Sequence, residues 1–132
     1  MTEKEKAKIR KQIKKAISLN GFEGLKNLQL KDSISLSLAL MICVESNSIE
    51  MSKYLLELGA SRLNICLRIA AYSHRDLTLA KILIKAGARD FDTALTYAKL
   101  NEDNVNMIRF FSYIKFYQNN KNYKNTKNVI FI

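Results

Sequence analysis

An eight-residue segment of this chain occurs twice, and its spacing constrains the fold more than any other feature of the sequence. Residues 53–60 read KYLLELGA, and residues 81–88, which follow 28 positions later, read KILIKAGA. Internal repetition with a period of about 20 to 50 residues is typical of stacked-repeat proteins. Each unit of such a protein buries its apolar face only against its neighbours. The sequence therefore predicts an array of short repeated units.

The 28-residue offset also relates residues outside this segment. Leu55, Leu83 and Phe111 occupy equivalent positions. They are predicted to lie in the core, together with their neighbours Leu56, Ile82 and Phe110. Apolar residues at spacings of three and four favour helices, so each unit is expected to contain an apolar helix, a polar turn and a second apolar helix. The chain is therefore predicted to be all-α, with helix-turn-helix units at residues 33–60, 61–88 and 89–117.

Several residues predict where these helices begin and end. Asp32 and Asp76 are candidate N-caps, because a carboxylate can accept the free amide protons of the next turn. Gly59 and Gly87 supply the left-handed residue that commonly follows a helix. Lys115 stands at the corresponding position of the third unit, so we expect its second helix to continue and to close the array.

The charged residues divide the chain into three parts. Residues 1–31 carry nine Lys or Arg and three acids, residues 32–114 carry nine of each, and residues 115–132 carry four Lys and no acid, which together give the net charge of +10. The first part predicts a basic helix over residues 4–19, stopped at Gly21, and then a degenerate capping unit. We therefore expect a cap at 1–31, repeats at 32–117 and a mobile basic tail at 118–132.

The side chains that commonly catalyse reactions or bind metals are few. His74 is the only histidine, and it lies in a polar turn between two predicted helices. Cys43 and Cys66 fall on apolar helices, where a cysteine usually fills the core. These three side chains lack the spacing and the fourth ligand of a zinc site. The sequence therefore predicts no enzyme activity, no catalytic or metal-binding residue and no cofactor.

The best-preserved unit resembles an ankyrin repeat. It has a small residue on its first helix, Ala71, and then Leu77 and the run LAKILIKAGA, which is similar to the helix and Gly-Ala ending of that family. An ankyrin unit has about 33 residues, so the units here lack about five residues of the β-hairpin finger. Units of this length resemble short ankyrin-like repeats that are common in large DNA viruses. The resemblance implies a nearly all-helical solenoid with shortened fingers.

The same resemblance implies a function in protein binding, without catalysis. Ankyrin-like units present their first helices and the adjacent turns to a protein partner. We expect Tyr72 and the arginines to be the main anchors, because aromatic residues and Arg are frequent at binding hot spots. The candidate partner-binding residues are Glu45, Asn47, Arg62, Tyr72, His74, Arg75, Arg89, Asp90, Asn101 and Glu102.

The basic N-terminal helix leaves an alternative function open. Its cationic side chains suit the phosphates of nucleic acid or an anionic membrane surface. The preferred interpretation is the solvated outer face of a capping helix, because terminal repeats need a polar exterior. The alternative is therefore a small basic protein that binds nucleic acid or anionic membranes through Lys4, Lys6, Lys8, Arg10, Lys11, Lys14 and Lys15.

The composition also predicts a location. The longest apolar run, around residues 38–44, is much shorter than the roughly 20 residues that a membrane span needs. Two cysteines and an N-terminus without a secretory leader indicate a reducing compartment. We expect an intracellular, cytoplasmic protein, which for a viral protein would be the host cytoplasm.

Overall fold

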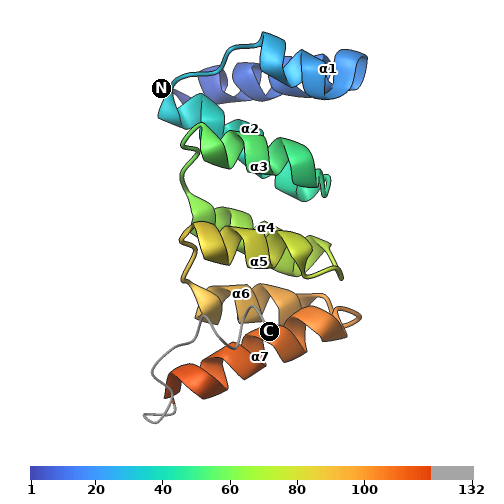
Figure 1. Cartoon of the computed structure of the whole chain (residues 1–132), viewed down its shortest axis with the longest axis vertical. Helices are drawn as coiled ribbons and strands as arrows, with labels where there is room; N and C mark the ends of the chain where they lie inside the picture. Colours follow the sequence, from blue (N-terminus) through green and yellow to red (C-terminus); the bar gives the residue numbers. More distant parts are fainter. Residues whose placement is uncertain (120–132) are drawn as a thin grey trace. The chain divides into compact units, whose positions relative to one another are not determined.

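The computed structural model describes residues 1–119 and contains seven α-helices and no strand within them (Figure 1). This confirms the predicted all-α class. The predicted tail lies outside the described residues from residue 120 onward. None of the described helices is long and apolar enough to cross a membrane. The helices are α1 (Glu3–Asn27), α2 (Ser33–Glu45), α3 (Ile49–Glu57), α4 (Leu63–Ser73), α5 (Thr78–Ala86), α6 (Phe91–Leu100) and α7 (Val105–Asn119).

The helices form two compact units, divided between Arg62 and Leu63. The 28-residue offset reappears in the helix starts. α4 begins at Leu63 and α6 at Phe91, 28 positions later. α7 begins at Val105, which is 28 positions after Leu77, the N-cap of α5. The repeat in the sequence is therefore a repeat of helix pairs in the second unit.

Asp32 is the N-cap of α2, as predicted, whereas the N-cap of α5 is Leu77. Asp76 lies one residue earlier, and its Oδ1 accepts from the hydroxyl of Thr78 at 2.6 Å. Asp32 Oδ1 accepts from the amide of Ser35 at 2.8 Å at the start of α2. Asp76 Oδ1 accepts from the amide of Thr78 at 2.9 Å, although α5 begins at Thr78 itself, two residues later than predicted. These hydrogen bonds to the charged form hold the pKa of Asp32 and of Asp76 below the usual value for an aspartate.

The two Gly-Ala pairs, at 59–60 and 87–88, end α3 and α5 in the same way. In the first pair the alanine amide donates to the carbonyl of Leu55 at 3.0 Å, and in the second it donates to the carbonyl of Leu83 at 2.9 Å. This bond spans six residues and defines a Schellman motif, which requires positive φ at the residue after the helix. The glycines supply it, with φ of 96° and 131°. α7 has no such stop and continues through Lys115, as predicted.

Two glycines shape the first helix. Gly21 has φ 56° and ψ −134°, a conformation that is essentially restricted to glycine, and it kinks α1 where the sequence predicted a stop. Gly24 is buried, and a Cβ atom there would clash with the backbone carbonyl of Ala16. The short segment after the kink therefore folds back closely on the first segment. Its Phe22 packs edge-on against Tyr54 of α3, with ring centroids 5.3 Å apart.

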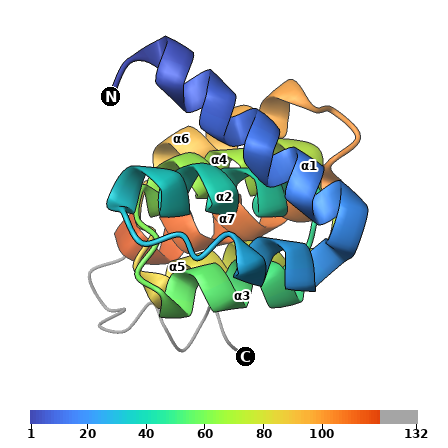
Figure 2. The same ribbon diagram turned by 90° about the horizontal axis from the view of Figure 1, so that it is seen from above.

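The core of the first unit centres on α2, which packs against both α1 and α3. α1 crosses α2 obliquely, and α3 runs back along it after a short turn (Figure 2). α2 is apolar around most of its circumference, as expected of a helix covered on more than one side. Leu40, Cys43 and Val44 on α2 and Leu55 on α3 each have 0% exposed surface.

The second unit consists of two helix pairs, α4–α5 and α6–α7. α4 packs against both α5 and α6, and α6 packs against α7. Leu67, Leu83 and Phe111 have 0% exposed surface, and the ring of Phe111 lies 6.4 Å from that of Phe91. Of the six predicted core residues, Leu55, Leu83 and Phe111 are thus confirmed, whereas their neighbours Leu56, Ile82 and Phe110 are only partly buried, because they lie at the edge of the buried side of their helices.

Candidate functional site

The described part of the chain contains no group of three or more His, Cys, Asp or Glu side chains that could hold a metal ion. Cys43 and Cys66 are free thiols with 0% exposed surface. Burial raises the pKa of Cys43 to about 11 and that of Cys66 to about 12. A nucleophilic cysteine needs a low pKa and access to solvent. Both cysteines therefore fill the core, as predicted.

In the second unit, side-chain hydrogen bonds join the α6–α7 turn (101–104) to the α4–α5 turn (74–77). Asn104 is fully buried, and its Nδ2 donates to the carbonyl of Ala71 at 2.6 Å and to the carbonyl of His74 at 2.7 Å. An amide side chain buried between two backbone carbonyls is costly to displace, because both carbonyls would lose their partner. The two turns are therefore held together.

Two large apolar side chains stand exposed beside these fastened turns. Tyr72 on α4 is 48% exposed, and Leu100 on α6 is 65% exposed. They occupy equivalent positions, 28 residues apart, at the ends of the two first helices. Asn101, next to Leu100, donates from Nδ2 to the carbonyl of Tyr72 at 2.9 Å. The backbone that carries Tyr72 is therefore tied to the backbone that follows Leu100.

Five of the predicted partner-binding residues belong to this region. We define the turn surface as these five residues together with Leu100, which precedes Asn101 at the end of α6 and is also a candidate contact residue in the sequence. Arg75 and Glu102 are exposed, while His74 and Asn101 are partly buried. The turn surface thus comprises Tyr72, His74, Arg75, Leu100, Asn101 and Glu102.

Three other predicted residues lie in the first unit. Glu45 ends α2, Asn47 lies in the α2–α3 turn with φ 57°, and Arg62 follows α3 with φ 59°. All three are exposed. They form a separate set from the turn surface, and their partner-binding role stays a prediction.

Arg89 and Asp90 form side-chain hydrogen bonds within the second unit that the sequence did not predict. Nη1 of Arg89 donates to the carbonyls of Ile84 and Ala88, both at 2.7 Å, at the end of α5. Asp90 is the N-cap of α6 and accepts from the amide of Thr93 at 3.3 Å. The side-chain atoms with which these residues would bind a partner are thus already engaged within the chain.

Asparagines are the residues that sequence reasoning missed. Besides Asn104, Asn64 accepts from the amides of Arg89 and Asp90 at 2.8 and 3.1 Å, and so joins α4 to the segment before α6. One signal was present, because Asn104 lies 28 positions after the helix-start residue Asp76. Nothing in the sequence showed that Asn104 would be buried.

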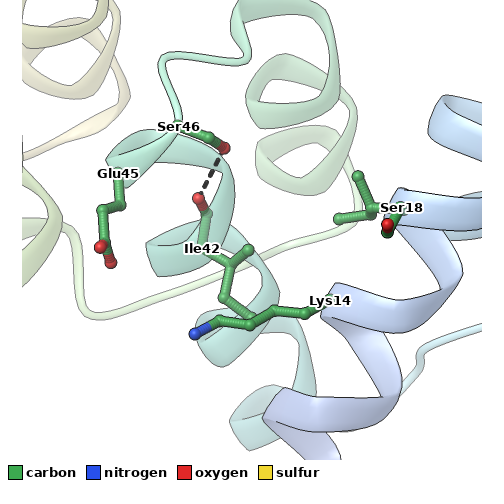
Figure 3. Close-up of a pocket in the computed structure, with 6 residues that line it drawn as sticks. Lys14, Ser18, Ile42, Glu45 and Ser46 are labelled. Carbon is green, nitrogen blue, oxygen red and sulfur yellow. Dashed lines mark hydrogen bonds between the residues drawn. The ribbon is translucent and has the colours of Figure 1, made fainter.

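The first unit carries a groove between α1 and the end of α2, with a volume of about 360 Å³ (Figure 3). Ile17 and Ile42 supply apolar walls, and Lys14 and Glu45 bring opposite charges to its edges. The groove joins one residue of the basic helix to one predicted partner-binding residue. It suits a single side chain of a partner more than a small molecule, because it is open to solvent.

The basic residues of α1 are placed unequally. Lys6 and Arg10 are partly buried, and Lys6 forms an ion pair with Glu3 at 3.1 Å. The other five residues of the predicted basic set, Lys4, Lys8, Lys11, Lys14 and Lys15, are exposed.

The sequence matches no protein-family model, and comparisons with curated proteins and with solved structures also give no match.

Proposed function

We propose that this chain is a non-catalytic protein-binding module of ankyrin-like repeats, which binds a protein partner through the turn surface. The observation that carries the proposal is the pair Tyr72 and Leu100. Both side chains are large, apolar and exposed, and both occupy the same position in successive helix pairs. Both lie beside the two turns that Asn101 and Asn104 hold together.

The physical support is preorganisation. Ordering side chains and loops at an interface opposes binding, so a surface that is already held in place loses less free energy on association. Tyr72 offers a large rigid ring, and the neighbouring Arg75 and Glu102 supply charges of both signs at its edge. Aromatic and Arg side chains are enriched among residues that dominate interface energies.

The proposed architecture is a solenoid of three helix pairs at residues 33–60, 61–88 and 89–117. Its support is the 28-residue offset between the starts of α4 and α6 and the matching Schellman motifs, also 28 residues apart, that end α3 and α5. The connections of four to five residues between successive pairs contain no strand. An intracellular location is part of the same proposal, since the two free cysteines suit a reducing compartment.

Affinity capture from a cell extract tests the proposal. The full chain and its Tyr72→Ala/Leu100→Ser variant are immobilised, and the captured proteins are quantified by mass spectrometry. If the two side chains act as a hot spot of about 2 kcal/mol or more, affinity for the true partner falls roughly thirtyfold or more. At least one captured protein should therefore be lost from the variant.

A matched control replaces the same kinds of side chain elsewhere. Leu19 and Phe116 are 69% and 61% exposed, so the Leu19→Ser/Phe116→Ala variant removes as much exposed apolar surface as the test variant. The control should capture the partner as well as the unaltered chain does. Capture profiles that are the same for all three proteins would refute the turn surface as the binding site.

A further inference from the structure

The first helix of the chain carries a row of lysines that the proposed protein-binding function does not use. Lys4, Lys8, Lys11 and Lys15 follow one another at spacings of four, three and four residues. With 3.6 residues per turn, they fall within an arc of about 60° on the helix circumference. All four are exposed, and they form no ion pair with any residue of the described chain. We call them the lysine row.

The opposite side of the same helix is fixed to the unit. Ile13 is only 1% exposed, and Ile9 and Ile17 are partly buried, so the apolar stripe of α1 is already covered. α1 therefore presents its charged side outward in a defined direction. The only acidic residues on α1 before the kink, Glu3 and Glu5, lie in its first turn, and Glu3 pairs with Lys6.

We propose that the lysine row binds the phosphate backbone of double-stranded nucleic acid, independently of base sequence. A rise of 1.5 Å per residue places the first and last lysine of the row about 16 Å apart along the helix. A duplex carries one negative charge per about 1.7 Å of its axis, so this length faces roughly ten phosphates. Four lysines on one face can then contact phosphates at the same time.

A membrane surface fits these observations less well. A helix that lies in a bilayer interface buries an apolar face among the lipids. In α1 that face, around Ile13, is covered by the protein, and the apolar side chain that lines the surface beside Lys4, Lys8 and Lys11 is the single methyl group of Ala7. Anionic lipid would therefore be bound by charge alone, or only after α1 leaves the unit. The lysine row therefore suits duplex nucleic acid, in which the phosphates are closely and regularly spaced, better than a lipid surface.

Fluorescence anisotropy with a labelled 20-base-pair duplex of random sequence tests the proposal, with DNA and RNA duplexes in parallel. The full chain is titrated at several salt concentrations between 50 and 200 mM. Four phosphate contacts predict a slope of log Kobs against log salt of about −3.6, which is a loss of roughly a hundredfold over this range. Binding to either duplex with this slope supports the proposal, and the two arms identify which nucleic acid is preferred.

Two variants of equal net charge separate the row from the total charge of +10. The test variant is Lys4→Gln/Lys8→Gln/Lys11→Gln/Lys15→Gln. The control replaces four exposed lysines elsewhere, as Lys31→Gln/Lys53→Gln/Lys85→Gln/Lys99→Gln. We expect the test variant to lose at least tenfold in affinity at 50 mM salt and most of the salt slope, while the control keeps both.

Replacing the same four lysines of the row by Arg should restore duplex binding, because charge and helix propensity are retained. Equal losses in the test and control variants would overturn the proposal, as would absence of duplex binding by the unaltered chain at 50 mM salt. Binding to vesicles containing phosphatidylserine with no binding to either duplex would overturn it too. Circular dichroism of each variant checks that the helices remain formed.

Discussion

The two helix pairs of the second unit have the same arrangement of helices, but some equivalent residues differ in exposure and polarity. Ile84 on α5 is 1% exposed, whereas Ser112, at the equivalent position of α7, is exposed. Ala71 on α4 is 0% exposed, whereas its equivalent on α6, Lys99, is exposed. At both positions the α4–α5 pair thus has a small or apolar residue that is buried, and the α6–α7 pair has a polar residue that is exposed to solvent.

The same comparison extends to the residues that join repeats. Asn64 on α4 accepts from the backbone amides that precede α6, and so holds the next pair. Asp92, its equivalent on α6, instead forms an ion pair with Lys115 at 2.7 Å. Lys115 itself stands where the preceding pair has Gly87, which ends a helix. At these positions the α6–α7 pair therefore has an ion pair between its own two helices, where the α4–α5 pair has a contact with the next pair and a helix stop.

Exchanging residues between the buried and exposed positions should have the largest effect on this comparison. Ile84→Ser removes a buried aliphatic side chain and leaves a buried hydroxyl, which should lower the free energy of unfolding by about 3 kcal/mol. Ser112→Ile should change it by less than about 0.5 kcal/mol, as surface substitutions usually do. Urea unfolding followed by circular dichroism measures both. A large loss for Ser112→Ile would mean that the outer side of α7 is covered in solution.

Removing the buried asparagine should have the next largest effect. Asn104→Ala leaves the carbonyls of Ala71 and His74 without this donor, at a cost of about 2 kcal/mol. Asp76→Ala, the equivalent substitution in the first pair, removes a solvent-exposed cap and should cost about 1 kcal/mol or less. The same unfolding experiment compares them, and equal losses would contradict the role given to Asn104 in fastening the turns.

A pH effect should distinguish Cys66 from Ala94, its equivalent on α6. In the unfolded chain the thiol loses its proton near pH 9, whereas in the folded protein burial raises its pKa to about 12. Above pH 9 the unfolded state therefore binds fewer protons, and the free energy of unfolding falls as pH rises. Between pH 8 and 10 the loss due to Cys66 should be about 1 kcal/mol.

The Cys66→Ala variant should lack this share of the pH dependence, so that its unfolding free energy falls less steeply than that of the unaltered chain. Cys43→Ala serves as a control, because Cys43 is also buried and its pKa is raised to about 11. Each substitution should remove only the part of the pH dependence that is due to the cysteine it replaces. Unchanged slopes in both would show that the thiols ionise as easily in the folded protein as in the unfolded chain.

The ion pair between Asp92 and Lys115 of the α6–α7 pair should have the smallest effect on the free energy of unfolding. Asp92 and Lys115 are 79% and 36% exposed, and surface ion pairs contribute up to about 1 kcal/mol. A double-mutant cycle with Asp92→Ala and Lys115→Ala should give a coupling energy below about 1 kcal/mol that vanishes in 1 M salt. Coupling that persists in high salt would indicate a pair shielded from solvent, contrary to its exposure.

Much of the helical organisation was predictable from the sequence because its signals are local. Gly59 and Gly87 end helices through backbone bonds to residues three to five positions away, and Asp32 caps a helix through Ser35. The break in α1 follows from the conformational freedom of Gly21. The surface was predicted only in part. Tyr72 and Leu100 are exposed as expected, but the side chains of Arg89 and Asp90, also expected at the binding surface, form hydrogen bonds within the chain.

The sequence by itself determined the class of fold, the 28-residue period, most helix ends and the core positions of Leu55, Leu83 and Phe111, because each depends on spacing or on neighbouring residues. The tertiary structure decided which polar residues face solvent and which fasten the chain. Asn104 and Asn64 bond to backbone groups 25 to 33 residues away, and Arg89 turns back to the end of α5. Such bonds exist only once helices have packed, so residue type and position alone could not distinguish a binding residue from a structural one.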